Sequence, residues 1–163
     1  MKKMILMLAL VLPMIASAQK LGHINSQELL ATMPELKTVQ AKLDTLAGQY
    51  EAQFANMQEE FNTKLAKFQQ EQATMTAGVR EFRQQEIAEM EQRIYLFRQT
   101  AQEDLQKKQQ EFMAPIQQRM LDAIKKVSQA QGCTYVFEAM TLHYIAPDAL
   151  DLMPLVKKEL GIQ

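Results

Sequence analysis

The sequence predicts an α+β fold that is mostly α, in which a small β-rich oligomerisation body carries a long antiparallel helical hairpin, or tentacle. Apolar residues recur at helical spacing from residue 35 to residue 131, which predicts long helices. Only five Gly and five Pro occur in 163 residues, too few for a sandwich or barrel with many tight turns. Short alternating segments near both ends of the chain indicate strands. This length suits one domain.

Residues 1–18 have the order of a secretory signal peptide. Lys2 and Lys3 form a charged region, an apolar run follows, and Ala16-Ser17-Ala18 is a small-x-small cleavage motif. The apolar run is too short to cross a hydrocarbon layer of about 30 Å, so a membrane anchor is disfavoured. We therefore expect cleavage before Gln19 and export of the mature chain.

The charge balance of the mature chain argues against nucleic-acid binding. Removing Lys2 and Lys3 leaves 16 basic and 19 acidic side chains, a net charge of −3, with no basic footprint. Cys133 is the only cysteine, so the chain forms no internal disulfide. A single cysteine in an exported protein suggests a free thiol or an intermolecular disulfide. The position of Cys133 just before Tyr135 favours instead a small side chain packed in the protein.

The first mature residues predict a strand and two helix starts. Residues 20–24 alternate as a short strand does, and Asn25 can cap a helix with Glu28 three residues later. A second helix start follows at residues 32–35, where Pro34 falls in the first turn and its missing N–H costs little. We assign residues 19–34 to the body.

The middle of the chain predicts two long helices joined by a turn. Apolar residues from Leu46 to Phe68 repeat in steps of 4, 4 and 3, which is an eleven-residue period typical of a nearly straight helix pair. The uncharged stretch 73–78 loses this period and contains Gly78, so we place the tip near residues 73–79. Residues 35–114 then form the hairpin. Pro115 should kink the returning helix and mark its border with the body.

The last part of the chain, residues 115–163, predicts the rest of the body. Gly132 ends the long helix, residues 133–138 form a strand, and residues 141–145 form a second strand in a β-hairpin. Asp151 caps a last helix, residues 152–160. A body of this size is marginal alone and its strands have open edges, so we expect oligomerisation. The residues expected at that interface are Leu21, Ile24, Tyr135, Val136, Phe137, Leu142 and Tyr144.

The ends of the chain resemble the Skp/OmpH family of periplasmic outer-membrane-protein chaperones. The motifs are Lys-Leu-Gly-His-Ile-Asn-Ser-Gln-Glu-Leu-Leu at 20–30, Ala-Pro-Ile-Gln-Gln-Arg-Met-Leu-Asp-Ala-Ile-Lys-Lys-Val at 114–127, Gly-Cys-Thr-Tyr-Val-Phe-Glu, Leu-His-Tyr-Ile, and Asp-Leu-Met-Pro-Leu-Val-Lys-Lys-Glu-Leu-Gly. They match the family's motifs in order and spacing across residues 20–161. The resemblance implies a periplasmic homotrimer with three tentacles around a cavity. It also implies ATP-independent holding of unfolded outer-membrane proteins. Well-known members are strongly basic, unlike this chain.

No pattern in the sequence predicts an enzyme, a cofactor or a metal site. There is no Ser-His-Asp, Cys-His, P-loop or zinc spacing, and His23 and His143, both expected in strands, lack acidic or thiol partners at ligand spacing. Two function classes remain: a holdase without stable membrane insertion, or a structural or adaptor coiled-coil hairpin of the cell envelope. The short body and the end motifs favour the holdase.

Client contact is expected near the tip of the tentacle, and motion at its base. Methionine is an adaptable apolar side chain, and the local charge near the tip is positive. The candidate client-binding residues are Met57, Met75, Met90, Lys64, Lys67, Arg80 and Arg83. Pro34 and Pro115 weaken helical continuity at the base and are the expected hinge.

Overall fold

The computed structural model describes residues 19–162, and the expected signal peptide lies outside them. The described chain divides into two compact units. The body comprises residues 19–29 and 122–161, and the finger comprises residues 30–121. The borders expected at residues 34 and 115 fall inside the finger.

The body contains a three-stranded sheet in which every pairing is parallel. Strands β1 (Lys20–Ile24), β2 (Cys133–Glu138) and β3 (Leu150–Asp151) lie in the order β2-β1-β3, so the N-terminal strand is central. Parallel neighbours need long crossover connections, which the finger supplies between β1 and β2.

The prediction of a β-hairpin at residues 133–145 is wrong. A 3₁₀ turn, η1 (Ala139–Thr141), follows β2, and no strand occurs between residues 142 and 149. The Leu142 N–H donates to the Ala139 carbonyl, and the Thr141 hydroxyl donates to the Glu138 carbonyl at 2.8 Å. These bonds close a helical turn where a hairpin turn was expected. His143 therefore lies outside any strand.

One face of the sheet is covered and needs a glycine. A Cβ added at Gly22 would lie 3.0 Å from Leu152 Cδ1 and 3.3 Å from Cys133 Sγ. Leu152, with Val156 of helix α4 (Met153–Leu160), is fully buried. Cys133 is half-buried, in keeping with the expected packed side chain.

The short helices of the body begin and end as the sequence predicts. The Asn25 side chain accepts the Glu28 N–H at 3.1 Å and donates to the Glu28 carboxylate, which caps helix α1 (Ser26–Thr32). Asp151 accepts the Met153 N–H at 2.8 Å, and Gly161, at φ +72°, ends α4. Both carboxylate oxygens of Glu138 also accept the Ser26 N–H, at 3.1 and 3.2 Å, so β2 supplies a second cap for α1.

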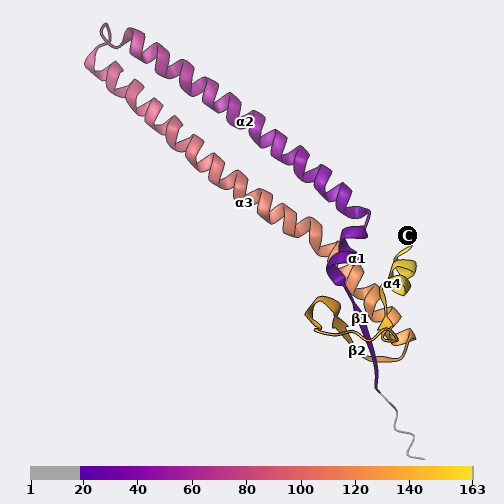
Figure 1. Cartoon of the computed structure of the whole chain (residues 1–163). Coiled ribbons are helices and arrows are strands. Elements are labelled where there is room, and N and C mark those ends of the chain that lie inside the picture. The colour runs from indigo at the N-terminus through magenta and orange to yellow at the C-terminus, as the bar shows by residue number, and fades with distance from the viewer. Residues whose placement is uncertain (1–18, 163) are drawn as a thin grey trace, which may run out of the picture. The chain divides into compact units, whose positions relative to one another are not determined.

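The finger is an antiparallel hairpin of two long helices, as predicted. Helix α2 (Glu35–Glu71) and helix α3 (Ala77–Ala130) run side by side (Figure 1). The turn occupies residues 72–76, so Gly78 belongs to α3 rather than to the turn. The Arg80 guanidinium donates to the carbonyls of Gln72 and Met75, which stabilises this turn. Helix α3 continues through Pro115 without interruption.

Candidate functional site

The seam between α2 and α3 uses most of the finger's apolar stripe. Most of the stripe residues that were expected to face the partner helix are half-buried or buried, including Val39, Leu46, Phe54 and Phe97, whereas Val79 and Phe82 are exposed. The Tyr50 and Phe97 rings meet edge-on with centroids 5.9 Å apart. These residues hold the hairpin together and leave little apolar surface on the seam itself.

The methionines expected to bind clients do not share one environment. Met90 is only 2% exposed, and its sulfur accepts a hydrogen bond from Arg93 at 3.3 Å. Its assignment to client binding is therefore corrected: Met90 is a seam residue, since a buried thioether cannot touch a client. Met57 and Met75 are half-buried.

Most of the basic side chains near the tip are engaged within the finger. Lys64 lies 3.3 Å from Glu86 and 3.6 Å from Glu60. Arg83 donates a 2.6 Å hydrogen bond to Glu86, which lowers the pKa of that carboxyl group. Among the described residues, Lys67 and Arg80 have no ion pair, and Arg80 donates instead to the carbonyls of the turn. The charges of Lys64 and Arg83 are thus neutralised locally, whereas those of Lys67 and Arg80 are not.

Exposed apolar side chains of α3 are the binding candidates that sequence reasoning missed. Phe82 is 60% exposed, Tyr95 is 68% exposed and Leu96 is 48% exposed. A signal was present in the sequence: Tyr95 and Leu96 fall between the seam positions 94 and 97, so they cannot face α2. They lie on a polar surface rich in Gln and Glu.

The uncovered face of the body sheet gathers further apolar residues. In the register of β1 and β2, Leu21 lies opposite Tyr135 and His23 opposite Phe137, so these four residues share the outer sheet face. The rings of Tyr135 and Phe137 are 6.4 Å apart. Leu142 and Tyr144, in the segment that follows, are also exposed. Five of the seven expected interface residues are therefore available on the surface of the chain.

The other two expected interface residues face inward. Ile24 is 3% exposed and belongs to the body core, so its assignment to the interface is corrected. Val136 is half-buried and pairs with Gly22, on the covered face of the sheet. Met140, which was not singled out, is 64% exposed beside the outer face residues in sequence.

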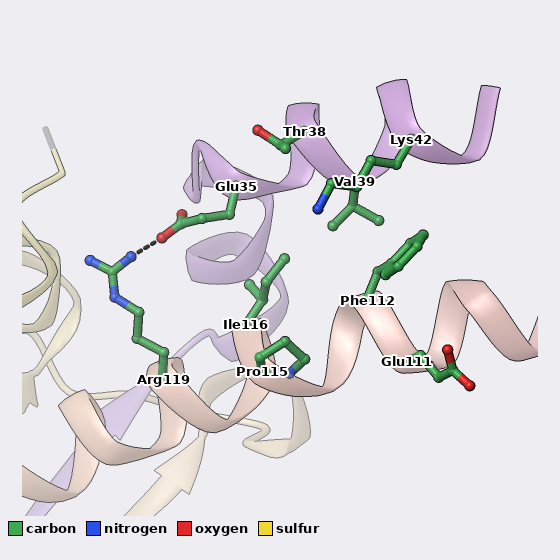
Figure 2. Close-up of a pocket in the computed structure, with 9 residues that line it drawn as sticks. All are labelled: Glu35, Thr38, Val39, Lys42, Glu111, Phe112, Pro115, Ile116 and Arg119. Atoms are coloured by element: carbon green, nitrogen blue, oxygen red, sulfur yellow. Dashed lines mark ion pairs between the residues drawn. The ribbon is translucent and has the colours of Figure 1, made fainter. Parts of the chain in front are cut away.

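A groove lies between the first turns of α2, from Glu35, and the part of α3 that reaches Arg119. One cavity of about 380 Å³ is lined by both helices, and the Glu35–Arg119 ion pair closes one side of it (Figure 2). Val39 of α2 points toward α3 (Figure 2), and the Lys42 nitrogen lies 5.3 Å from the centroid of the Phe112 ring. The expected hinge residue Pro115 lines this cavity, while Pro34 is the N-cap of α2. The hinge itself stays a prediction.

The described residues contain no group of three or more His, Cys, Asp or Glu arranged to hold a metal ion. Within residues 19–162, no helix combines the length and apolar character needed to cross a bilayer.

Comparison with known proteins gives this architecture a family. The OmpH family, described as outer membrane protein (OmpH-like), matches residues 20–160. The chain belongs to this OmpH-like family. The resemblance inferred from the end motifs is thereby confirmed.

Relatives of this OmpH-like chain carry the name chaperone protein Skp. The protein of Yersinia enterocolitica is 26% identical over 151 residues, which cover 90% of this chain and 92% of the relative. The protein of Pectobacterium atrosepticum is 24% identical over 145 residues, covering 89% and 87%. Among solved structures, an OmpH-like chain from Caulobacter crescentus has a TM-score of 0.75 at 18% identity, covering 87% of this chain and 83% of its own length. The predicted fold class, with its helical hairpin and small sheet, is confirmed.

Proposed function

We propose that this OmpH-like chain is a periplasmic holdase chaperone that binds unfolded outer-membrane β-barrel proteins without ATP and prevents their aggregation. The observation that carries the proposal is the set of exposed apolar side chains on α3, namely Phe82, Tyr95 and Leu96. Phe82 lies twelve or more residues from the adjacent pair Tyr95 and Leu96, so the three are spread along the helix rather than gathered in one deep pocket. Many weak apolar contacts suit an unfolded client, because no single pocket must fit it.

Relatives named chaperone protein Skp support this proposal over an adaptor role. The small body supports it as well, since an adaptor hairpin would need a larger attachment domain. Export by a cleaved signal peptide, from the pattern of residues 1–18, would bring the chain to the compartment that such clients cross.

The working form we propose is a homotrimer assembled through the body. Two features support assembly. The outer sheet face leaves Leu21, Tyr135 and Phe137 in water. In addition, β2 pairs with β1 alone among the described strands, so its other edge has unpaired backbone groups. A second copy can cover both, whereas a monomer can cover neither.

The test is an aggregation assay with the mature protein, residues 19–163. An unfolded outer-membrane β-barrel protein is diluted from urea with and without the chaperone, in the absence of nucleotide. We expect light scattering by the client to fall as the chaperone approaches stoichiometric amounts, and added ATP to change nothing. Unchanged client aggregation, with the chaperone folded by circular dichroism, would refute the proposal.

A further inference from the structure

The groove at the base of the finger extends beyond the cavity of Figure 2. A second cavity of about 510 Å³ adjoins the first, because Thr38, Lys42 and Phe112 line both. Volumes of several hundred cubic ångströms are typical of sites that hold a sizeable group. The groove is therefore large enough for an aromatic or long aliphatic side chain and the backbone that carries it.

The floor of the groove is apolar. Val39 and Ile116 are 9% and 6% exposed, and Phe112 is half-buried. Figure 2 shows Val39 on α2 and Ile116 and Phe112 on α3 directed into the same space. Phe112 is the least buried of the three, and covering its ring removes apolar surface from water, which favours binding of an apolar side chain.

Among the described residues, one cation that lines the groove, Lys42, has no carboxylate partner. Arg119 is paired with Glu35, and Lys108 lies 2.7 Å from Glu111. Lys42, in contrast, sits 5.3 Å from the centroid of the Phe112 ring and has no carboxylate partner among the described residues. A cation over an aromatic ring can still accept an anion on its open side.

We propose that this groove is a peptide-binding site for a client segment that carries an aromatic or long aliphatic side chain next to an Asp or Glu. The apolar side chain covers Val39, Phe112 and Ile116, while the carboxylate pairs with Lys42. This inference rests on the proposed chaperone function and adds a sequence preference to it.

The test uses short fluorescent peptides that differ at one position. Each has acetylated and amidated ends and one Phe in a Gly/Ser host, and the residue beside Phe is Glu, Gln or Lys. Fluorescence anisotropy with the mature protein should rank the affinities as Glu above Gln above Lys. We expect the Glu peptide to bind about two- to fivefold more tightly than the Gln peptide, which is the range of a partly exposed ion pair.

Two variants connect that preference to the groove. Lys42→Gln should make the Glu and Gln peptides bind equally, while Lys37→Gln, on the exposed face of α2, should keep the preference. Thr38→Trp places a large ring at the exposed edge of both cavities and should weaken all three peptides at least fivefold. Its control is Thr63→Trp, an equal change at an exposed position of the same helix.

The outcomes separate this inference from the proposed function. If the wild-type protein suppresses client aggregation but the peptides show no charge preference, the inference is wrong and the chaperone function stands. The same holds if Lys42→Gln and Thr38→Trp match their controls. If the wild-type protein does not suppress aggregation, the proposed function itself fails. Circular dichroism of each variant confirms that the finger is folded.

Discussion

The Tyr50 hydroxyl donates a 2.7 Å hydrogen bond to the Asp104 carboxylate across the seam of the finger. It is a polar contact at the centre of an otherwise apolar stripe, and it sits beside the ring contact between Tyr50 and Phe97. An apolar seam can slide by one turn at modest cost, whereas a specific polar pair fixes one register. The pair therefore helps to fix how α2 and α3 align, together with the ion pairs Lys64–Glu86 and Glu35–Arg119.

We predict that Tyr50→Phe lowers the stability of the finger less than Tyr50→Ala does. Phe keeps the edge-on ring contact and loses only the hydrogen bond, whereas Ala loses both. Urea unfolding followed by helical circular dichroism measures the midpoints. Equal midpoints for Tyr50→Phe and the wild type would show that the hydrogen bond does not stabilise the hairpin.

The same pair predicts a dependence on alkaline pH. The hydrogen bond to Asp104 raises the pKa of Tyr50 above its ordinary value of 10.0. Because the folded-state pKa is raised, the stabilisation is fully present below pH 10.0 and is lost as pH rises through the folded pKa. Ultraviolet titration should show one tyrosine that ionises late, and Asp104→Asn should remove that late step.

Client holding should depend on the exposed apolar residues of α3. Replacing Phe82, Tyr95 and Leu96 together by Gln keeps the helix and removes apolar surface. We expect the chaperone concentration needed to suppress aggregation to rise about tenfold, equivalent to about 1.4 kcal/mol. Holding by the wild type should survive about 1 M salt, where the Debye length is about 3 Å. Loss of holding in salt, with normal holding by the triple variant, would indicate an electrostatic contact.

A matched comparison for that variant is Met90→Gln. Met90 is buried, so its replacement should lower the unfolding midpoint of the finger rather than weaken client contact directly. The triple Gln variant should fold normally and bind clients weakly. Met90→Gln should be destabilised by about 1–3 kcal/mol, because it buries an amide without a hydrogen-bond partner.

Substitutions in the body should separate assembly from folding. Tyr135→Glu places a charge on the outer sheet face and should give a folded monomer. Ile24→Glu buries a charge in the core and should unfold the body. Light scattering gives the mass, and circular dichroism gives the fold. Gln69→Glu, on the exposed surface of α2, is the control that should leave both unchanged. A trimeric Tyr135→Glu variant would exclude the outer face from the interface.

Removing the second cap of α1 should destabilise the body. Glu138→Ala leaves the Ser26 N–H without its carboxylate acceptor, and loss of a helix cap costs about 0.5–2 kcal/mol. Glu138→Gln keeps an acceptor oxygen and should lose less. Thermal unfolding compares the three proteins. If Ala and Gln have the same effect, the cap geometry does not account for the stabilisation.

The sequence predicts local and periodic features of this fold well, because their causes lie close together in the chain. The eleven-residue stripe predicts the seam, and adjacent residues predict the helix caps at Asn25 and Asp151 and the helix end at Gly132. The strand predicted at residues 141–145 does not form, because strand pairing depends on residues that are far apart in the sequence. Residues 141–145 have strand-like composition, but β1 occupies one edge of β2 and η1 turns the chain away.

Surface assignments were less predictable, because exposure depends on the angle of each side chain around a helix. Met90 and Tyr95 both lie on α3, yet one is 2% and the other 68% exposed. Residue type suggests Met90 as a client contact, whereas position relative to the seam indicates that Tyr95 is the residue a client can reach. The groove near Lys42 could not be anticipated either, since it depends on how two helices distant in sequence meet.

The central position of β1 has a consequence for the order in which the protein forms. This strand is made among the first residues of the mature chain, yet its partners β2 and β3 come more than 100 residues later. The finger, closed by a short local turn at residues 72–76, can form while β1 is still unpaired. The body sheet then completes only when the chain is nearly finished. In the homotrimer proposed above, assembly through that sheet would therefore follow formation of the finger in each copy, which would act as a checkpoint against premature assembly.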